Sequence, residues 1–165
     1  MAQHPDLTGD ASRALKEGRA MLFRRAAEKI GAENTIVTDL LPEHVHGTAN
    51  GHWATTSIGT ANSYANMANA TVSSTRWLMF TGLSHSEAIG ELDMYRIQRG
   101  TSVAREYNVT TTDNFRHATF WASDPVIVNE NTNVTLQFAA RSTGTVTDYD
   151  VFGETAERVG ITISP

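Results

Sequence analysis

The chain has 165 residues, of which 40% are hydrophobic and 19% charged, with a formal net charge of −5 and no cysteine. This length suits one domain with an extension and is short for two independent cores. The acidic balance excludes a broad electrostatic attraction to nucleic acid or to a membrane surface, so we expect neither as a partner. The absence of cysteine excludes disulfides, thiolate nucleophiles and cysteine-based metal sites. No segment resembles a membrane helix or a secretion signal, so we expect synthesis in a host cytoplasm.

The first predicted element is a helix between Thr8 and Ile30. This segment contains no proline, Thr8 and Asp10 can both cap its N-terminus, and Gly31 follows as a stop signal. Five apolar residues keep helical spacing, namely Ala11, Leu15, Leu22, Ala26 and Ile30. The pattern predicts one buried face, which packs either on the protein's own sandwich or on a neighbouring subunit.

The next segment, from Glu33 to Gly59, is rich in Asn, Thr, His and Gly around one apolar patch, Ile36–Leu41. We interpret it as a linker or extended arm. The predicted organisation is therefore an N-terminal helix and arm over residues 1–59 and a β-sandwich over residues 60–165. Apolar side chains of the arm are the predicted partner contacts, and they are Leu15, Leu22, Phe23, Ile30, Ile36, Leu40 and Leu41.

After Thr60 the sequence becomes a series of short β-prone segments separated by Gly, Asn, Asp and Ser. Asn133–Ala140 alternates apolar and polar residues most clearly, and Arg158–Ile163 repeats the pattern as a predicted closing strand. Further strands are expected near residues 63–72, 90–97, 115–122 and 144–151, with turns at 99–101 and 142–145. This pattern predicts an all-β fold, an antiparallel β-sandwich or jelly roll, behind the N-terminal helix.

The run Trp77–Phe80 is apolar at every position. Such a run suits a central strand that is buried on both faces within the chain. It equally suits a strand with one face in the core and the other against a partner subunit, which would indicate an oligomer.

Three stretches of the sandwich carry a resemblance to a known group of proteins. They are Thr60–Val72, Arg76–Leu83 and Glu91–Gly100, followed by the terminal Val159–Ile163. In strand texture, the region from Trp53 to Pro165 resembles the β-sandwich domains of phage head-fibre, decoration and tail proteins. Those domains are similar to the trimeric jelly rolls of the tumour-necrosis-factor type. The resemblance implies a virion location and a homotrimer, and it assigns no functional residue.

Candidate chemical sites are few. His44 and His46, with His52 nearby, could share a metal if the segment is extended, because alternate residues then point the same way. Glu91, Asp93, Asp148 and Asp150 could form a carboxylate pair or a calcium site, but any exposed β-face produces the same spacing. No sequence motif of a serine hydrolase, a phosphate-binding loop or a zinc protease is present. We therefore expect no catalysis and no cofactor.

Two functions remain. The first is a non-enzymatic virion structural protein, in the head or the tail, that forms a homotrimer and attaches to capsid or tail subunits through its N-terminal arm. The second is a carbohydrate- or receptor-binding module, in which loops such as Ser84–Gly90 and Tyr107–Asn114 contact a host glycan. Trp53, in the polar arm, is the tryptophan expected to lie outside the core.

Overall fold

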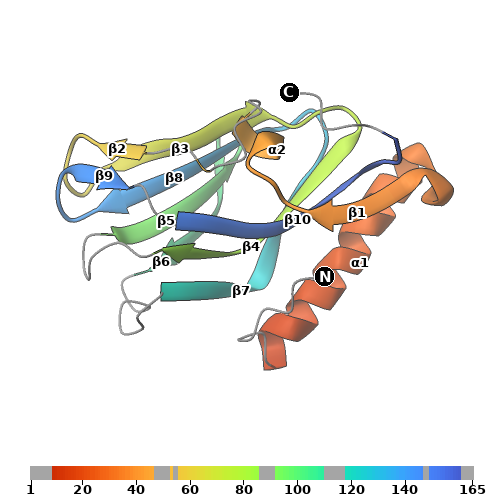
Figure 1. The fold of residues 1–165 in the computed structure, drawn as a ribbon, viewed down its shortest axis with the longest axis horizontal. Helices are drawn as coiled ribbons and strands as arrows, with labels where there is room; N and C mark the ends of the chain where they lie inside the picture. Colours follow the sequence, from red (N-terminus) through yellow and green to blue (C-terminus); the bar gives the residue numbers. More distant parts are fainter. Residues whose placement is uncertain are drawn as a thin grey trace.

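The computed structural model describes residues 9–46, 53, 56–85, 92–109, 118–146 and 149–160. It consists of two facing four-stranded sheets, with a long helix across the outer face of one of them (Figure 1). The helical elements are α1 (Gly9–Ile30), the short 3-10 turn η1 (Ala32–Asn34) and α2 (Glu43–His46). The strands are β1 (Thr35–Asp39), β2 (Thr56–Ile58), β3 (Tyr64–Thr71), β4 (Arg76–His85), β5 (Leu92–Arg99), β6 (Ser102–Asn108), β7 (Ala118–Val128), β8 (Asn133–Ala140), β9 (Gly144–Val146) and β10 (Tyr149–Arg158).

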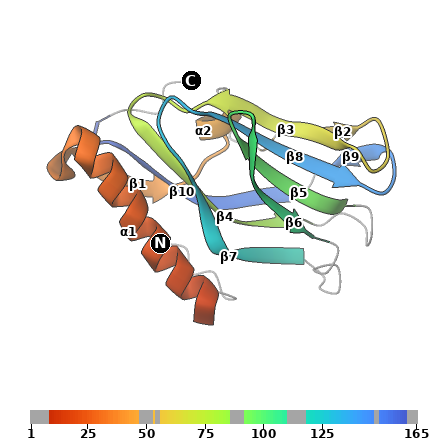
Figure 2. The same cartoon turned by 180° about the vertical axis from the view of Figure 1, so that it is seen from behind.

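The strands pair in an order that differs from their order in the sequence. One sheet, here the β4 sheet, has the order β1-β10-β4-β7, and the other, the β8 sheet, has the order β3-β8-β5-β6 (Figure 2). Strands β2 and β9 form a small separate pair. All these pairings are antiparallel. The predicted fold class, an antiparallel β-sandwich preceded by a helix, is confirmed.

Strand β4 is buried on both of its faces. Leu78 and Phe80 point into the core between the two sheets, where they join residues of both sheets. Trp77 and Met79 point the opposite way and pack under α1. The apolar run Trp77–Phe80 is thus covered entirely by the chain itself, and its composition is no longer an argument for a partner subunit.

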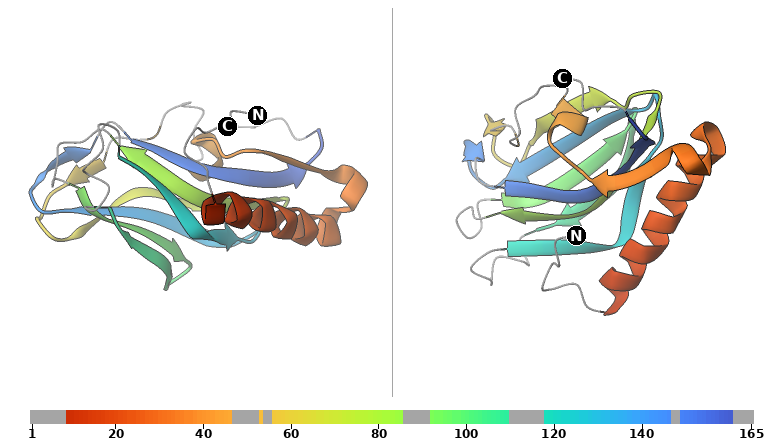
Figure 3. Two further views of the ribbon diagram at one scale, coloured as in Figure 1. Left: turned by 90° about the horizontal axis from the view of Figure 1, so that it is seen from below. Right: turned by 45° about the vertical axis from the view of Figure 1, so that its right-hand side comes forward.

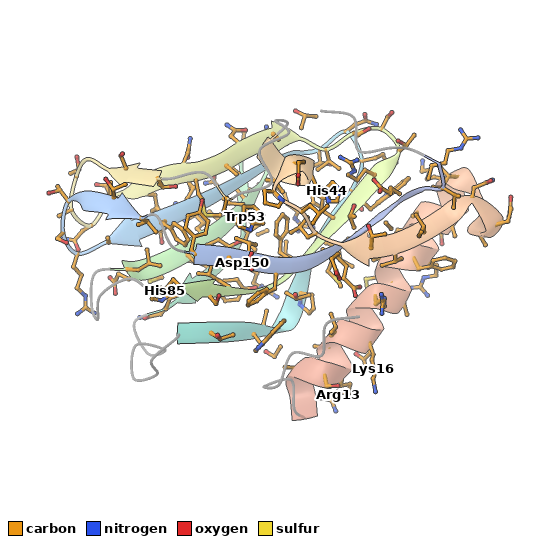
Figure 4. All side chains as sticks on the ribbon, viewed as in Figure 1. Arg13, Lys16, His44, Trp53, His85 and Asp150 are labelled. Carbon is orange, nitrogen blue, oxygen red and sulfur yellow. The ribbon has the colours of Figure 1, made fainter. Side chains whose placement is uncertain are left out.

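Helix α1 lies close to the β4 sheet because small residues line its inner face. Ala14, Gly18, Leu22 and Ala26 recur every four residues and are all buried. At Gly18 an added Cβ would lie 2.7 Å from Met79 Sδ, so a side chain there would push the helix away. Arg13 and Lys16 lie on the outer side of the helix (Figure 4). None of the described helices is long and apolar enough to span a membrane.

The segment predicted to be an extended arm contributes strands to the sheets. Thr35–Asp39 forms β1, which pairs with the whole second half of β10 from Glu154 to Arg158. Strand β2 pairs with β9 in the same way. The interpretation of Ile36–Leu41 as a free patch on an arm is corrected accordingly, because its backbone completes one edge of the β4 sheet. Figure 3 shows α1 and β1 alongside the sandwich in two further views.

Most predicted strands are confirmed, with one clear correction. Strand β8 coincides with the predicted Asn133–Ala140, and Gly100, at φ 59°, closes the β5–β6 hairpin. The closing strand is β10, which ends at Arg158 where the predicted one began. Val159 and Gly160 form a turn, and residues 161–165 lie outside the described residues. The turn predicted at 142–145 joins β8 to β9, which do not pair with each other.

A pair of adjacent substitutions tests whether α1 belongs to the core. We expect Leu22→Ala to lower the free energy of unfolding by about 2–5 kcal/mol, because Leu22 is fully buried beside Trp77 and Met79. Its neighbour Phe23 is exposed, so Phe23→Ala should cost less than about 1 kcal/mol. Urea unfolding of the three proteins measures the difference. Equal small effects of both substitutions would mean that α1 does not stabilise the sandwich.

Candidate functional site

The outer edge of β1 presents unpaired backbone groups. The N–H of Leu40 donates to the Gly153 carbonyl at 3.0 Å, and the N–H of Val159 donates to the Asn34 carbonyl at 2.7 Å. These two bonds fix the alternation of the antiparallel ladder, so Val37 and Asp39 direct their N–H and C=O groups away from β10. No other strand in the described part of the chain pairs with this edge. An edge of this kind is a template for strand pairing with another chain.

Exposed apolar side chains accompany this edge. Ile36 on β1 and Leu41 just after it are 43% and 37% exposed, and Phe23 on α1 is 37% exposed. Phe23 stands seven residues before Ile30, hence on the same side of the helix, and Ile30 packs in the cluster that includes Val37 of β1. We call the unpaired backbone of β1, together with Phe23, Ile36 and Leu41, the β1 edge surface. Phe23 and Ile36 flank the edge on opposite faces of the sheet, because Ile36 alternates with Val37, which packs on the helix side.

The structure divides the predicted partner contacts into two groups. Leu22, on α1, is fully buried between the helix and the β4 sheet. Leu40 is 7% exposed, in the core between the two sheets, so neither residue can contact a partner in this fold. Leu15 and Ile30 are half-buried against the helix-side core. The prediction is corrected for the two buried leucines. Their sequence pattern indicated that they are buried, but it did not show which surface covers them. Phe23, Ile36 and Leu41 remain accessible.

The extended geometry in which the histidines could share a metal is not present at His44. His44 and His46 lie in the helical turn α2, so the chain is not extended there as the shared metal site assumed. His44 is buried, and its Nδ1 accepts a hydrogen bond from the Leu41 N–H at 3.0 Å. His52 lies outside the described residues. Among the described residues no group of three or more metal-binding side chains comes together.

The carboxylates considered for catalysis are held by other side chains. Asp150 on β10 accepts a hydrogen bond from Trp53 Nε1 at 2.7 Å (Figure 4), and Asp93 on β5 pairs with Arg141 at 3.3 Å. These two aspartates belong to different sheets, whereas Glu91 and Asp148 lie outside the described residues. Trp53 is half-buried, so it is neither a core residue nor a free platform.

The outer face of the β8 sheet is polar and internally bonded. Gln137 Nε2 donates to Asn66 Oδ1 at 2.8 Å, and Arg96 forms an ion pair with Glu106 at 2.7 Å while lying over the Tyr64 ring. None of the exposed large hydrophobic residues on the described chain belongs to β3, β5 or β8. Among the described residues of this sheet, the one exposed large hydrophobic side chain is Val103 on the edge strand β6, whereas the β1 edge surface has several.

No protein-family model and no curated protein sequence matches the chain. Among solved structures it is similar to the infectious bursal disease virus VP2 subviral particle, with 12% identity, 76% of this chain, 33% of that chain and a TM-score of 0.34. It is also similar to the PRD1 vertex protein P5, with 8% identity, 77% and 97% coverage and a TM-score of 0.38. A family 35 carbohydrate binding module from Clostridium thermocellum matches at 16% identity, 76% and 92% coverage and a TM-score of 0.32. The chain spans about a third of VP2, and at these TM-scores we draw no functional argument from the similarities.

The environment of His44 generates a pH prediction. Burial, and to a smaller extent the Arg76 charge, lowers the pKa of His44 from 6.5 to about 4, although Glu157 and Glu43 act in the opposite direction. The unfolded chain binds a proton near pH 6.5 that the folded chain excludes until pH 4. Stability should therefore fall by up to roughly 3 kcal/mol as the pH drops from 6.5 to 4.

The variant His44→Asn isolates this contribution. The Asn Oδ1 can still accept the Leu41 N–H bond, but the side chain does not titrate. We expect the free energy of unfolding to depend less on pH in this variant than in the parent, measured by urea unfolding at pH 7.5 and 4.5. An identical decrease in both proteins would show that His44 is not the group responsible.

Proposed function

We propose that this protein is a non-enzymatic virion structural component of a phage-like virus, in the head (decoration or fibre) or in the tail. It is made in the host cytoplasm, forms a homotrimer and attaches to capsid or tail subunits. The observation that carries the proposal is the β1 edge surface, where unpaired strand backbone and exposed apolar side chains occur together. A glycan on the host surface is a further proposed partner.

The β1 edge surface has the composition expected of a protein–protein contact surface. Strand β7 carries Asp124 and Pro125, which discourage pairing at an edge, whereas the one charge of β1 is Asp39 at its end. Phe23, Ile36 and Leu41 are each about two-fifths exposed, so burying the exposed parts would contribute about 0.6–1.2 kcal/mol for each side chain. Backbone hydrogen bonds from Val37 and Asp39 would fix the orientation of the partner at this apolar contact.

A ring of three copies uses this surface in a head-to-tail manner. In such a ring the edge of one copy contacts a different surface of the next, and the contact closes after three steps. Each copy then buries its own β1 edge surface against the next copy in the ring. The attachment element predicted from the sequence therefore acts as part of the sandwich, with α1 and β1 held in place before any partner binds.

Self-association is tested by a charge at the centre of the β1 edge surface. We expect the parent chain to have the mass of a trimer in light scattering and Ile36→Lys to have the mass of a monomer. A lysine at an edge strand repels strand pairing while leaving the fold intact, since Ile36 is exposed. The matched control is Val103→Lys on β6, an exposed apolar residue at the edge of the other sheet, which should stay trimeric.

Two results would contradict this part of the proposal. One is a monomeric parent chain at high concentration. The other is a parent and an Ile36→Lys variant that have the same oligomeric mass. Circular dichroism of each variant establishes that the mass is measured on folded protein.

The virion location is tested separately. Particles of the virus that encodes the chain are purified, and their proteins are identified by mass spectrometry. The proposal requires the chain to remain with the particles at a fixed copy number after a salt wash. Its presence in the soluble fraction alone would overturn the structural role.

The second candidate is a carbohydrate- or receptor-binding module. The observation that favours it is Trp53, which is half-buried, fixed by Asp150 and in contact with the Tyr149 ring at a centroid distance of 6.4 Å. An anchored aromatic side chain of this kind can present one face to a sugar. Most of the loops named for this role lies outside the described residues, namely 86–90 of Ser84–Gly90 and 110–114 of Tyr107–Asn114.

A further inference from the structure

A groove of about 320 Å³ opens on the side of the sandwich opposite the β1 edge. Its walls come from α1, from the edge strand β7 of the β4 sheet and from the edge strand β6 of the β8 sheet with the preceding Arg99. Three arginines line it, Arg25 on the helix, Arg99 at the end of β5 and Arg105 on β6. Its volume is at the lower end of small-molecule sites and suits a ligand of the size of one sugar ring.

Two of these arginines are fixed by neutral acceptors. Arg99 Nη1 donates to the Ile127 carbonyl at 3.1 Å, and Arg25 Nη1 donates to Asn129 Oδ1 at 2.9 Å. Ile127 and Asn129 are two residues apart, about 7 Å along the chain, so both guanidinium groups are tied to the end of β7 and the residue that follows it. Each retains further N–H donors after these bonds.

The charge of this pair is not balanced by the chain. In the described part of the molecule neither Arg25 nor Arg99 forms an ion pair with a carboxylate, whereas Arg105 pairs with Asp124. The groove thus has three guanidinium groups against Glu17 and Asp124, in a chain whose formal net charge is −5. Both arginines line the same groove and lack a carboxylate partner on the described chain, so each can donate charge-assisted hydrogen bonds to an anion that enters it.

The remaining walls narrow the class of ligand. Ala104 and Pro125 offer apolar surface to the C–H face of a ring, and Ser123 and Glu17 offer acceptors for hydroxyl groups. An inorganic anion would use the arginines alone and leave the rest of the groove unfilled. A sugar ring that carries a carboxylate uses both parts.

We propose that this groove binds an acidic saccharide, with the ligand carboxylate held between Arg25 and Arg99. The inference rests on the glycan contact within the proposed function and is independent of assembly through the β1 edge surface. It places that contact at the seam between α1 and the two sheets, in a groove that Trp53 does not line.

The probe is methyl glucuronide, titrated into the full chain and followed by ligand-observed and protein-observed NMR. We expect saturable binding in the millimolar range, weakened at least tenfold in Arg25→Gln/Arg99→Gln. The control is Arg24→Gln, which removes one guanidinium charge from an exposed helix position outside the groove and should bind within twofold of the parent. Methyl glucoside, which lacks the carboxylate, should bind at least tenfold more weakly than the glucuronide.

Several outcomes would overturn the proposal. They are absence of saturable binding, equal weakening by Arg24→Gln, and equal binding of the glucoside. Equal affinity for inorganic sulfate, or binding of an acidic peptide in place of the glucuronide, would reject a saccharide as the ligand. Repeating the titration with Ile36→Lys separates the two hypotheses, since the groove should bind equally well in a chain that no longer assembles.

Discussion

The packing of α1 on the β4 sheet is the interaction on which the rest of the structure depends. A four-stranded sheet has two faces, and the β8 sheet can cover only one of those of the β4 sheet. The other face carries Trp77, Met79 and Ile127, which would be left in water without the helix. Leu22 and Ala26 fill the space above them, and the glycine at position 18 allows the close approach. The helix is thus the third layer of the fold.

This contact also determines where the open edges lie. At the end of α1 the chain reverses at Gly31, whose φ is +88°, and the side chains of Asn34 and Thr35 donate hydrogen bonds to the carbonyls of Ile30 and Gly31. The reversal places β1 beside β10 and under the same helix. Gly153 permits this arrangement, since a Cβ there would collide with the Met79 carbonyl at the irregular register of β10. With β1 added, the free edge of the β4 sheet moves outward to Val37 and Asp39.

The sequence was sufficient to predict elements whose signal is local. The period of the helix between Thr8 and Ile30 and the alternation in Asn133–Ala140 both depend on neighbouring residues, and both elements formed as predicted. It was insufficient wherever the outcome depended on a partner far along the chain. Ile36–Leu41 had too few residues to distinguish an edge strand from an arm, because only its pairing with β10 defines it. The same limit explains why Leu22 and Leu40 were assigned to a partner.

The candidate sites show that limit more strongly. His44 and His46 suggested a metal only on the assumption of an extended chain, and the turn α2 removes that geometry. The groove was not predicted at all, since Arg25, Arg99 and Arg105 are spread over α1, β5 and β6 and have no common motif. The one available signal was the excess of arginine among the cations of an acidic chain, which does not locate a site. Convergence of residues from separate elements can be recognised only after folding.

The two open sides of the sandwich differ in a way that suits two different partners. At the β1 edge surface the exposed groups are apolar side chains and backbone, which a protein surface can cover with hydrogen bonds and hydrophobic contact. At the groove the exposed groups are positioned cations beside a small concavity, which favour a compact anion over a broad surface. Helix α1 separates the two, because it lies along the face between β1 and β7. Assembly through the β1 edge surface leaves the groove free for a ligand when the surface contacted on the next copy lies outside the groove.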